Sequence, residues 1–343
     1  MELSERKKQI LATIVRTYVQ TGEPVGSKAL CDSLGGISSA TIRNEMSYLA
    51  ENGYLTQPHT SAGRIPTNRA YRLYIDDLMP RRAPSEALMA QIRRMLPDSS
   101  ADSQRAVLSA VSALSKATGC AALITAQTSS GTLIHKIEFI PMGFNRALMV
   151  LVTSAGAVIS RMYSFSNNLT GELISRFLNL VEDNLLGKEL CSVQPATLQT
   201  IVAGAGEYAF ELTEPVFALG EIIEEVGKAK LQLVGETRLL SHPGITLSKA
   251  HEMFELFSGG EEVLAMLDAW GKESGVILGG DTSYSALDRS SLVLSKYSVG
   301  NATTGYIGII GPTRMDYDSI LPGIEYFAHL LSTTDKEHTK GLI

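Results

Sequence analysis

The sequence has few cysteines, a single tryptophan and no long apolar run. Its three cysteines, at positions 31, 120 and 191, are odd in number and widely spaced, which excludes a disulfide framework and a cysteine metal cluster. The densest apolar run, residues 147–152, is far shorter than the roughly 20 residues of a membrane-spanning helix. Charged residues dominate positions 1–8, where a signal peptide carries an apolar segment. We therefore predict a cytoplasmic protein with reduced thiols and no membrane partner.

Motifs of enzymes are also absent. The sequence has no Gly-rich phosphate loop ending in Lys-Ser/Thr, and residues 204–206 form a lone Gly-x-Gly without the third glycine of a dinucleotide site. Residues 279–281 begin a nucleotide-cyclase signature that the following Thr-Ser leaves incomplete, so both segments are interpreted as turns. The six histidines lack the spacing of metal ligands. We expect no enzyme activity, no cofactor and no metal.

Length and charge indicate more than one domain. At roughly 150 residues per domain, the chain of 343 residues predicts two or three domains. A content of 44% hydrophobic and 19% charged residues excludes a wholly disordered, collagen-like or coiled-coil chain. Residues 1–82 hold 11 Lys and Arg against 8 Asp and Glu, a net charge of +3, whereas the remainder carries −9. This asymmetry is typical of a small nucleic-acid-binding domain attached to an acidic body.

The first eighty residues predict a winged helix. Helical spacing of apolar residues marks a helix over 5–19, then a short helix with Ser27 as its N-cap, then a third helix over about 38–52 that Ser38 caps. Two short strands around the tip Pro58–Gly63 follow. Three helices followed by a hairpin form a winged helix, and its second and third helices form a helix-turn-helix.

The third helix is amphipathic, and its polar face has the chemistry to read DNA. Ile42, Met46 and Leu49 form the apolar stripe. On the other face, Arg43 can bond a guanine edge bidentately and Asn44 an adenine edge, and the helix N-terminus attracts phosphate. A merely solvated polar face is the alternative, but the order of helices and hairpin favours DNA binding. The predicted DNA-binding residues are Ser39, Ala40, Thr41, Arg43, Asn44, Ser47, Tyr48, His59, Thr60, Ser61, Arg64 and Arg69.

The remaining chain alternates strands with a helical block. Residues 81–104 form a linker that contains a short helix, and its charges Arg81, Arg82, Arg93 and Arg94 are interpreted as solvated. Helices are predicted over 106–117, 169–186, 198–212, 216–231 and 320–331. Strands are predicted over 120–126, 133–140, 146–153, 156–163, 276–279, 291–298 and 304–311. This order predicts an α+β multidomain chain with an inserted segment.

Two motifs resemble those of a known family. Residues 38–46 with the wing sequence 57–67, and the segment 305–317 near the C-terminus, are similar to the bacterial heat-inducible transcription repressor HrcA family. The resemblance implies a homodimer that binds double-stranded, inverted-repeat operator DNA of chaperone operons and that the chaperonin keeps active. The domains that it implies are a winged helix over 1–80, a linker over 81–104, a GAF-like α/β domain over 105–164 and 251–338, and an inserted, mainly helical dimerisation domain over 165–250.

Two groups of residues leave alternatives open. The apolar residues Leu212, Val216, Phe217 and Ile223 of the insertion either form the dimer contact or pack within the body. Arg314, which follows a strand and precedes a helix, either binds an anion together with Thr313 or pairs with Asp316 or Asp318 to hold a domain contact. The structural role is favoured because arginine forms interface ion pairs readily.

Three functions are compatible with these features. A dimeric DNA-binding repressor is the leading hypothesis. A winged-helix regulator whose GAF-like domain binds a small effector is the second, and a ligand that shifts DNA affinity would separate it from the first. A metabolic enzyme with an accessory winged helix is the third, and the absence of a catalytic constellation argues against it.

Overall fold

The computed structural model describes residues 3–59, 62–95, 103–129, 131–143, 145–242, 245–299 and 303–338. It divides into two compact units. Unit 1 comprises residues 1–124, 231–296 and 306–330, and unit 2 comprises residues 125–230, 297–305 and 331–343. The chain crosses from one unit to the other five times, after residues 124, 230, 296, 305 and 330.

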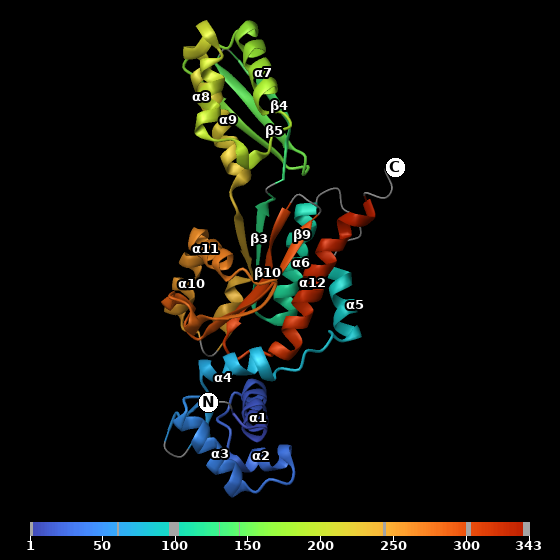
Figure 1. Ribbon diagram of the computed structural model, residues 1–343, viewed down its shortest axis with the longest axis vertical. Coiled ribbons are helices and arrows are strands. Elements are labelled where there is room, and N and C mark those ends of the chain that lie inside the picture. The colour runs from blue at the N-terminus through green and yellow to red at the C-terminus, as the bar shows by residue number, and fades with distance from the viewer. Residues whose placement is uncertain are drawn as a thin grey trace. The chain divides into compact units, whose positions relative to one another are not determined.

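The first part of unit 1 is the predicted winged helix (Figure 1). Its elements are α1 (Glu5–Thr21), α2 (Ser27–Leu34), α3 (Ser39–Glu51), β1 (Leu55–Thr56), β2 (Ile65–Pro66) and α4 (Asn68–Leu73), which continues as a π-helical turn over Tyr74–Leu78. The helices enclose a core in which Ile10, Ile14 and Leu30 are fully buried. One local prediction was wrong. Gly26 occupies the N-cap of α2, and Ser27 is its first helical residue.

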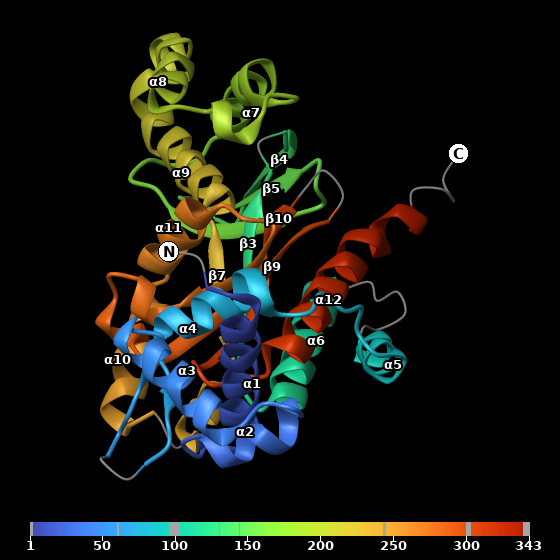
Figure 2. The same cartoon turned by 60° about the horizontal axis from the view of Figure 1, so that its bottom comes forward.

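The second part of unit 1 is an α/β body around a five-stranded sheet. The strand order is β7-β3-β10-β9-β8. The strands are β3 (Ala121–Thr128), β7 (Lys230–Val234), β8 (Ser274–Leu278), β9 (Ser290–Val299) and β10 (Thr303–Pro312), and the helices are α6 (Ser103–Thr118), α10 (Leu247–Gly259), α11 (Glu261–Trp270) and α12 (Tyr317–His338). In both views α10 and α11 lie on one side of the sheet and α6 and α12 on the other (Figure 1, Figure 2).

Burial on both faces explains why the central strands β3, β9 and β10 hold apolar residues at consecutive positions. Leu292, Leu294 and Ile310 belong to the cluster that includes α10 and α11. The alternate residues Val293 and Ile309 point to the opposite face and are also fully buried. The predicted strands here are confirmed, whereas β7, α10 and α11 had not been predicted.

Unit 2 has a sheet and a core of its own. Its antiparallel sheet has the order β4-β5-β6, with β4 (Ile134–Pro141), β5 (Arg146–Thr153) and β6 (Val158–Ser164). The helices are α7 (Gly171–Leu185), α8 (Pro195–Ala203) and α9 (Ala209–Gly227). Alternate residues of β5, Ala147, Met149 and Leu151, pack in one cluster with Phe177 of α7 and Leu219 of α9.

This core moves the boundary of the insertion. Strands 134–164 were expected in the GAF-like domain, and the insertion at 165–250 was expected to be mainly helical. The structure groups the three strands with α7–α9 because they share one apolar core, and it places residues 231–250 in unit 1. The predicted division between helices at 212 and 216 is also wrong, because the chain turns at Gly204–Gly206 and α9 continues through Pro215.

The expected linker is partly docked. Its helix α5 (Glu86–Met95) lies against α12, since a Cβ on Gly323 would be 3.1 Å from Leu88. Ile92 is 1% exposed. The Arg93 Nε donates to the Tyr326 hydroxyl at 2.6 Å. Arg93 is therefore a contact of this helix with the body rather than an unbound solvated charge.

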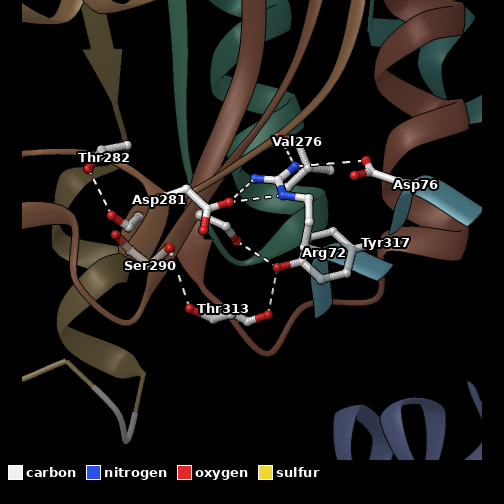
Figure 3. A network of polar contacts seen from close by, with 10 residues as sticks. Arg72, Asp76, Val276, Asp281, Thr282, Ser290, Thr313 and Tyr317 are labelled. Carbon is white, nitrogen blue, oxygen red and sulfur yellow. Dashed lines mark hydrogen bonds and ion pairs between the residues drawn. The ribbon is translucent and has the colours of Figure 1, made fainter. Parts of the chain in front are cut away.

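An arginine fixes α4 to the body (Figure 3). The Arg72 Nε donates to Asp281 Oδ2 at 2.9 Å, and its Nη1 donates to the carbonyl oxygen of Val276 at 3.1 Å. Asp281 ends the 3₁₀ turn over 279–281, which confirms the predicted turn and gives its acid a partner. Because the planar guanidinium bonds a carboxylate and a carbonyl at the same time, it fixes both the distance of α4 from the body and its orientation.

A second polar cluster lies at the start of α12. The Tyr74 hydroxyl donates to Asp318 Oδ1 at 2.5 Å and accepts from Arg16 Nε at 3.0 Å. The same Arg16 Nε is 3.5 Å from Asp318 Oδ2. Burial and the bond to Asp318 raise the pKa of Tyr74. The phenol therefore stays protonated and joins α1, the π-helical turn and α12.

Arg314 also lies against the winged helix. A Cβ placed on Gly22, whose φ is +74°, would be 2.1 Å from Arg314 Nη1. Only glycine combines this left-handed conformation with so close an approach. Among the described residues, the ion-pair partner of Asp318 is Arg16 and not Arg314.

We expect the Arg72–Asp281 pair to stabilise unit 1. In a double-mutant cycle with Arg72→Met and Asp281→Asn, the coupling free energy of urea unfolding should be about 1 kcal/mol. The Asp281 side chain is 41% exposed, so solvent screening keeps this value below that of a buried pair. Arg81→Met, at an exposed position, is the matched control. Strict additivity of the two changes would show that the pair contributes nothing.

Candidate nucleic-acid interface

The third helix of the winged helix presents its polar face outward as predicted. Ser38 is its N-cap, and the Ser38 Oγ accepts from the Thr41 backbone N–H at 3.2 Å. No acidic residue occupies the first turn. Ile42 and Leu49 are fully buried and Met46 is 5% exposed, which confirms the apolar stripe. The positive end of the helix dipole is therefore available to an anion such as a phosphate.

Arg43 and Asn44 are the residues of α3 whose side chains are best placed to form hydrogen bonds with a bound ligand. Both side chains are exposed, and within the described part of the chain neither makes a hydrogen bond or an ion pair. Ala40 is exposed on the same helix. An arginine and an asparagine one position apart supply bidentate donors and a donor–acceptor pair to adjacent bases in a major groove.

The acid in the middle of α3 is turned away from this face. Glu45 is 16% exposed at its side chain, and its Oε2 lies 3.0 Å from Lys7 Nζ of α1. Arg6 Nη1 is 4.0 Å from the other oxygen. Lys7 Nζ also lies 4.4 Å from the ring centroid of Tyr48. These contacts neutralise the carboxylate that would otherwise repel a phosphate backbone.

Other predicted residues of α3 serve the turn that precedes it. The Ser39 and Ser27 hydroxyl oxygens lie 3.1 Å apart, and those of Thr41 and Ser38 lie 2.9 Å apart. The first contact joins α2 to α3, and the second lies within the N-terminal cap of α3. Ser47, like Tyr48, is only partly exposed.

The wing is held at its base by the backbone of the segment after α1. Val25 and Arg64 exchange two backbone hydrogen bonds, each of 2.9 Å. A Cβ on Gly63 would lie 2.5 Å from the Val25 carbonyl carbon and oxygen, so this position of the Ser-Ala-Gly-Arg motif accepts glycine alone. The Arg64 guanidinium donates to the Gln57 side chain across the hairpin. His59 is exposed at the tip, and the predicted contacts Thr60 and Ser61 lie outside the described residues.

Arg69 contributes to the domain itself. Its Nη1 donates to the carbonyl oxygen of Asn52 at 3.0 Å, and its guanidinium carbon lies 4.6 Å from the Tyr54 ring centroid. The side chain is thus attached to the end of α3. The structure brings Ala40, Arg43 and Asn44 together on an unobstructed face, and it gives Arg64 and Arg69 partners within the winged helix.

The sequence interpretation missed the residues that hold this face in position. Arg72, Tyr74 and Arg16 meet acids from the far end of the chain, Asp281 and Asp318. The acidic turn after β8 and the arginine-rich first domain were visible in the sequence. However, no feature of the sequence indicates which of these residues, more than 200 positions apart, are in contact.

Comparisons with known proteins match both parts of the chain. The family model described as "Winged helix-turn-helix transcription repressor, HrcA DNA-binding" matches residues 2–77. The model described as "HrcA protein C terminal domain" matches residues 104–321. A solved structure described only as a hypothetical protein superposes with a TM-score of 0.59 at 23% identity, covering 98% of this chain and 99% of that one, which shows a shared fold.

Curated relatives match at nearly full length. The chain is 32% identical to "Heat-inducible transcription repressor HrcA" of Geobacter sulfurreducens over 96% of this chain and 98% of that protein. It is also 32% identical to the protein of the same name from Acetivibrio thermocellus, over 100% and 98%. Across the described ranges, no helix combines the length and apolarity of a membrane span. The chain belongs to the HrcA family of heat-inducible transcription repressors.

Proposed function

We propose that this protein is a homodimeric repressor that binds an inverted-repeat operator upstream of chaperone genes, with α3 of each subunit in a major groove. The observation that carries the proposal is the outward face of α3, where Arg43 and Asn44 are exposed beside an acid that α1 neutralises. The names of the relatives support the heat-inducible genes as targets. Repression then consists of occupying promoter DNA.

Base reading and backbone binding are assigned to different residues. Arg43, Asn44 and Ala40 face base edges, while the N-terminus of α3 and the wing around His59 follow the phosphates. Arg64 and Arg69 support the wing and the end of α3 through the bonds described above. Their roles in binding are therefore partly indirect.

We expect Arg43→Ala or Asn44→Ala to lower the affinity for the operator by about 1–3 kcal/mol and the affinity for random DNA much less. Arg43→Lys is the matched control, because it keeps the charge and removes the bidentate geometry. Binding is measured at one fixed salt concentration by fluorescence anisotropy. An Arg43→Ala protein that binds the operator like the parent would rule out α3 as the recognition helix.

A dimer is needed because one winged helix reads too few base pairs to select a site in a genome. For three of the four residues with two alternatives, the structure favours packing within the body. Leu212, Val216 and Ile223 are 1%, 0% and 4% exposed and pack inside unit 2. Phe217 is 45% exposed. Phe210, two helical turns earlier on α9, is 80% exposed.

These two aromatic rings supply the dimer contact in our proposal. Residues seven apart lie on the same face of a helix, so the rings form one exposed apolar ridge on α9. Water-exposed phenylalanines at this spacing are unfavourable in a monomer and are typical of an interface. The two-fold axis of such a dimer matches a palindromic operator.

We expect the double variant Phe210→Ser/Phe217→Ser to sediment as a monomer at micromolar concentrations where the parent is a dimer. Its operator affinity should fall at least tenfold because each half-site then binds alone. Leu247→Ser is the control, since Leu247 is 75% exposed but lies on α10 of unit 1. A parent protein that stays monomeric even on DNA contradicts the dimer.

The topology supports dependence on the chaperonin. Neighbouring strands β3 and β7 of the five-stranded sheet are separated in sequence by unit 2, and β10 joins β3 only when the C-terminal part is made. Pairing of such distant strands is slow and leaves apolar segments such as Ala121–Ile124 exposed in intermediates. Under heat stress other unfolded proteins would occupy the chaperonin, and the repressor would not regain its active form.

We expect operator binding lost on mild heating to return with chaperonin and ATP, and to return poorly without them. Trp270 reports on the body during the experiment, because its ring lies 5.7 Å from the ring of Tyr306. Full spontaneous recovery, or no benefit from the chaperonin, would reject this control. Regulation by a small-molecule effector would then be the favoured hypothesis, because a cavity lies beside Arg314.

A further inference from the structure

Two sulfur atoms and an imidazole ring gather at the start of β3 in unit 1. The Cys120 Sγ lies 3.8 Å from Met315 Sδ and 3.9 Å from His242 Nε2. Cys120 directly precedes β3, Met315 lies between β10 and α12, and His242 follows a 3₁₀ turn. Three segments of the α/β body thus bring a thiol, a thioether and an imidazole together.

A glycine keeps the space around the two sulfurs open. A Cβ placed on Gly311 of β10 would lie 2.7 Å from Met315 Sδ and 2.8 Å from Cys120 Sγ, so a larger residue would displace a sulfur. Cys120 is 3% exposed and Met315 is 5% exposed, whereas His242 is half-buried. All three residues line a cavity of about 760 Å³, which provides a path for an ion.

The separations between these atoms fit one three-coordinate metal ion. Sulfur and nitrogen ligands lie about 2.0–2.3 Å from a first-row metal, so the ligands of a trigonal ion lie about 3.5–4.0 Å apart. Both measured separations fall in this range. Each separation alone is also an ordinary packing distance. The cluster is distinguished by the convergence of two further kinds of metal ligand on one thiol.

The kinds of ligand select monovalent copper. Thiolate and thioether ligands favour Cu(I), and imidazole also binds copper. Zinc sites take their ligands from Cys, His and carboxylates, and in the described ranges no three such residues form a group that could hold a metal. The other two ligands are 122 and 195 positions from Cys120, so the residue spacing from which we expected no metal could not reveal them.

We propose that Cys120, Met315 and His242 bind one Cu(I) ion. The thiol gives its proton to solvent as the copper–sulfur bond forms, and copper keeps its oxidation state, so no electron is exchanged. In the metal-free protein His242 Nε2 lies 3.1 Å from the carbonyl oxygen of Gly119, which indicates that this nitrogen carries the proton. On binding, the imidazole takes the tautomer with its proton on Nδ1, and the lone pair of Nε2 bonds the copper.

The surroundings of Cys120 argue against a role as a nucleophile. Burial raises the pKa of its thiol to about 11, so the free thiol stays protonated. The other two cysteines differ from it. Cys31 is partly exposed and Cys191 is exposed, and the Cys191 Sγ lies 3.7 Å from a carboxylate oxygen of Glu189. A test of copper binding therefore has to remove these two thiols first.

Binding is measured on the full chain that carries Cys31→Ser and Cys191→Ser as the background. Cu(I) is titrated without oxygen against the coloured chelator bicinchoninate, and Zn²⁺ is titrated in parallel. We expect one Cu(I) per chain, bound at least about a hundredfold more tightly than Zn²⁺. X-ray absorption at the copper edge should show two sulfur neighbours and one nitrogen neighbour. Equal affinity for the two ions, or a single sulfur neighbour, overturns the proposal.

Three substitutions in this background locate the ion. Met315→Leu conserves the side-chain volume but removes the thioether, and His242→Gln removes the imidazole. Each should weaken Cu(I) binding at least tenfold, and Cys120→Ala should abolish it. Met253→Leu, at a methionine that is 1% exposed, and His251→Gln on α10 are the matched controls and should bind like the background. Thermal unfolding without copper identifies any variant that does not fold. A folded Met315→Leu protein with unchanged Cu(I) affinity overturns the proposal.

The bound ion also bears on the winged helix. Met315 follows Arg314, whose guanidinium lies against Gly22 at the end of α1. An ion that fixes Met315 restrains the loop that contacts the winged helix, and its effect on operator binding rests on the function proposed above.

Operator affinity is therefore measured separately, with and without Cu(I). We expect a change of about threefold or more in the background protein and none in Met315→Leu. Copper binding without such a change supports the site and rejects the coupling to DNA. If the metal-free protein binds no operator at all, the proposed function fails, while the copper titration still decides the site.

Discussion

The attachment of α4 to the α/β body is the constraint on which the use of this molecule depends. A winged helix is a small domain, and its recognition helix is useful only if the rest of the chain controls where it points. Arg72 provides this control by bonding the Asp281 carboxylate and the Val276 carbonyl at once. Arg16, Tyr74 and Asp318 add a second polar attachment, and the edge-to-face contact of Tyr71 and Tyr317, with ring centroids 6.2 Å apart, adds an apolar one. Hydrogen bonds thus fix the orientation of α4 on the body, and the contact between buried rings stabilises it.

Around the outward face of α3, most charged side chains also have partners within the domain. Glu45 is neutralised by Lys7, and Arg64 and Arg69 are engaged in the wing and at the end of the helix. Arg43 and Asn44 remain exposed among the described residues. Most cations of the domain therefore organise it, and only a few are left to read DNA. A count of positive charges would overestimate the contacts available to a phosphate backbone.

Unit 2 affects the order of folding more than the final structure of the five-stranded sheet. Unit 2 has its own three-stranded sheet and its own core, in which Phe139, Phe165 and Phe177 are in ring contact. The strands on either side of it, β3 and β7, are neighbours in the sheet. Unit 2 can fold from local contacts before the later strands of the five-stranded sheet pair with β3. This order of events is the reason for the chaperonin dependence that we propose.

The sequence by itself determined the local features of this protein. The helical periodicity, the Ser38 cap, the glycine stops and the hairpin specify the winged helix, because each depends on residues within a few positions of one another. The polar residues Arg43 and Asn44 followed from the apolar stripe on the opposite face. Family motifs extended this reading to the whole chain. Boundaries that depend on sharing a core, such as that at residue 125, did not follow.

Only the tertiary structure decided which residues meet. It paired Arg72 with Asp281, buried Leu212 and Val216 while exposing Phe210, and left the buried Tyr71 hydroxyl without a hydrogen-bond partner among the described residues. An apolar residue on a helix is compatible with a core or with an interface, and an arginine is compatible with DNA or with an acid. The choice between them depends on the side chains that other segments bring within a few ångströms, and a one-dimensional pattern does not contain that information.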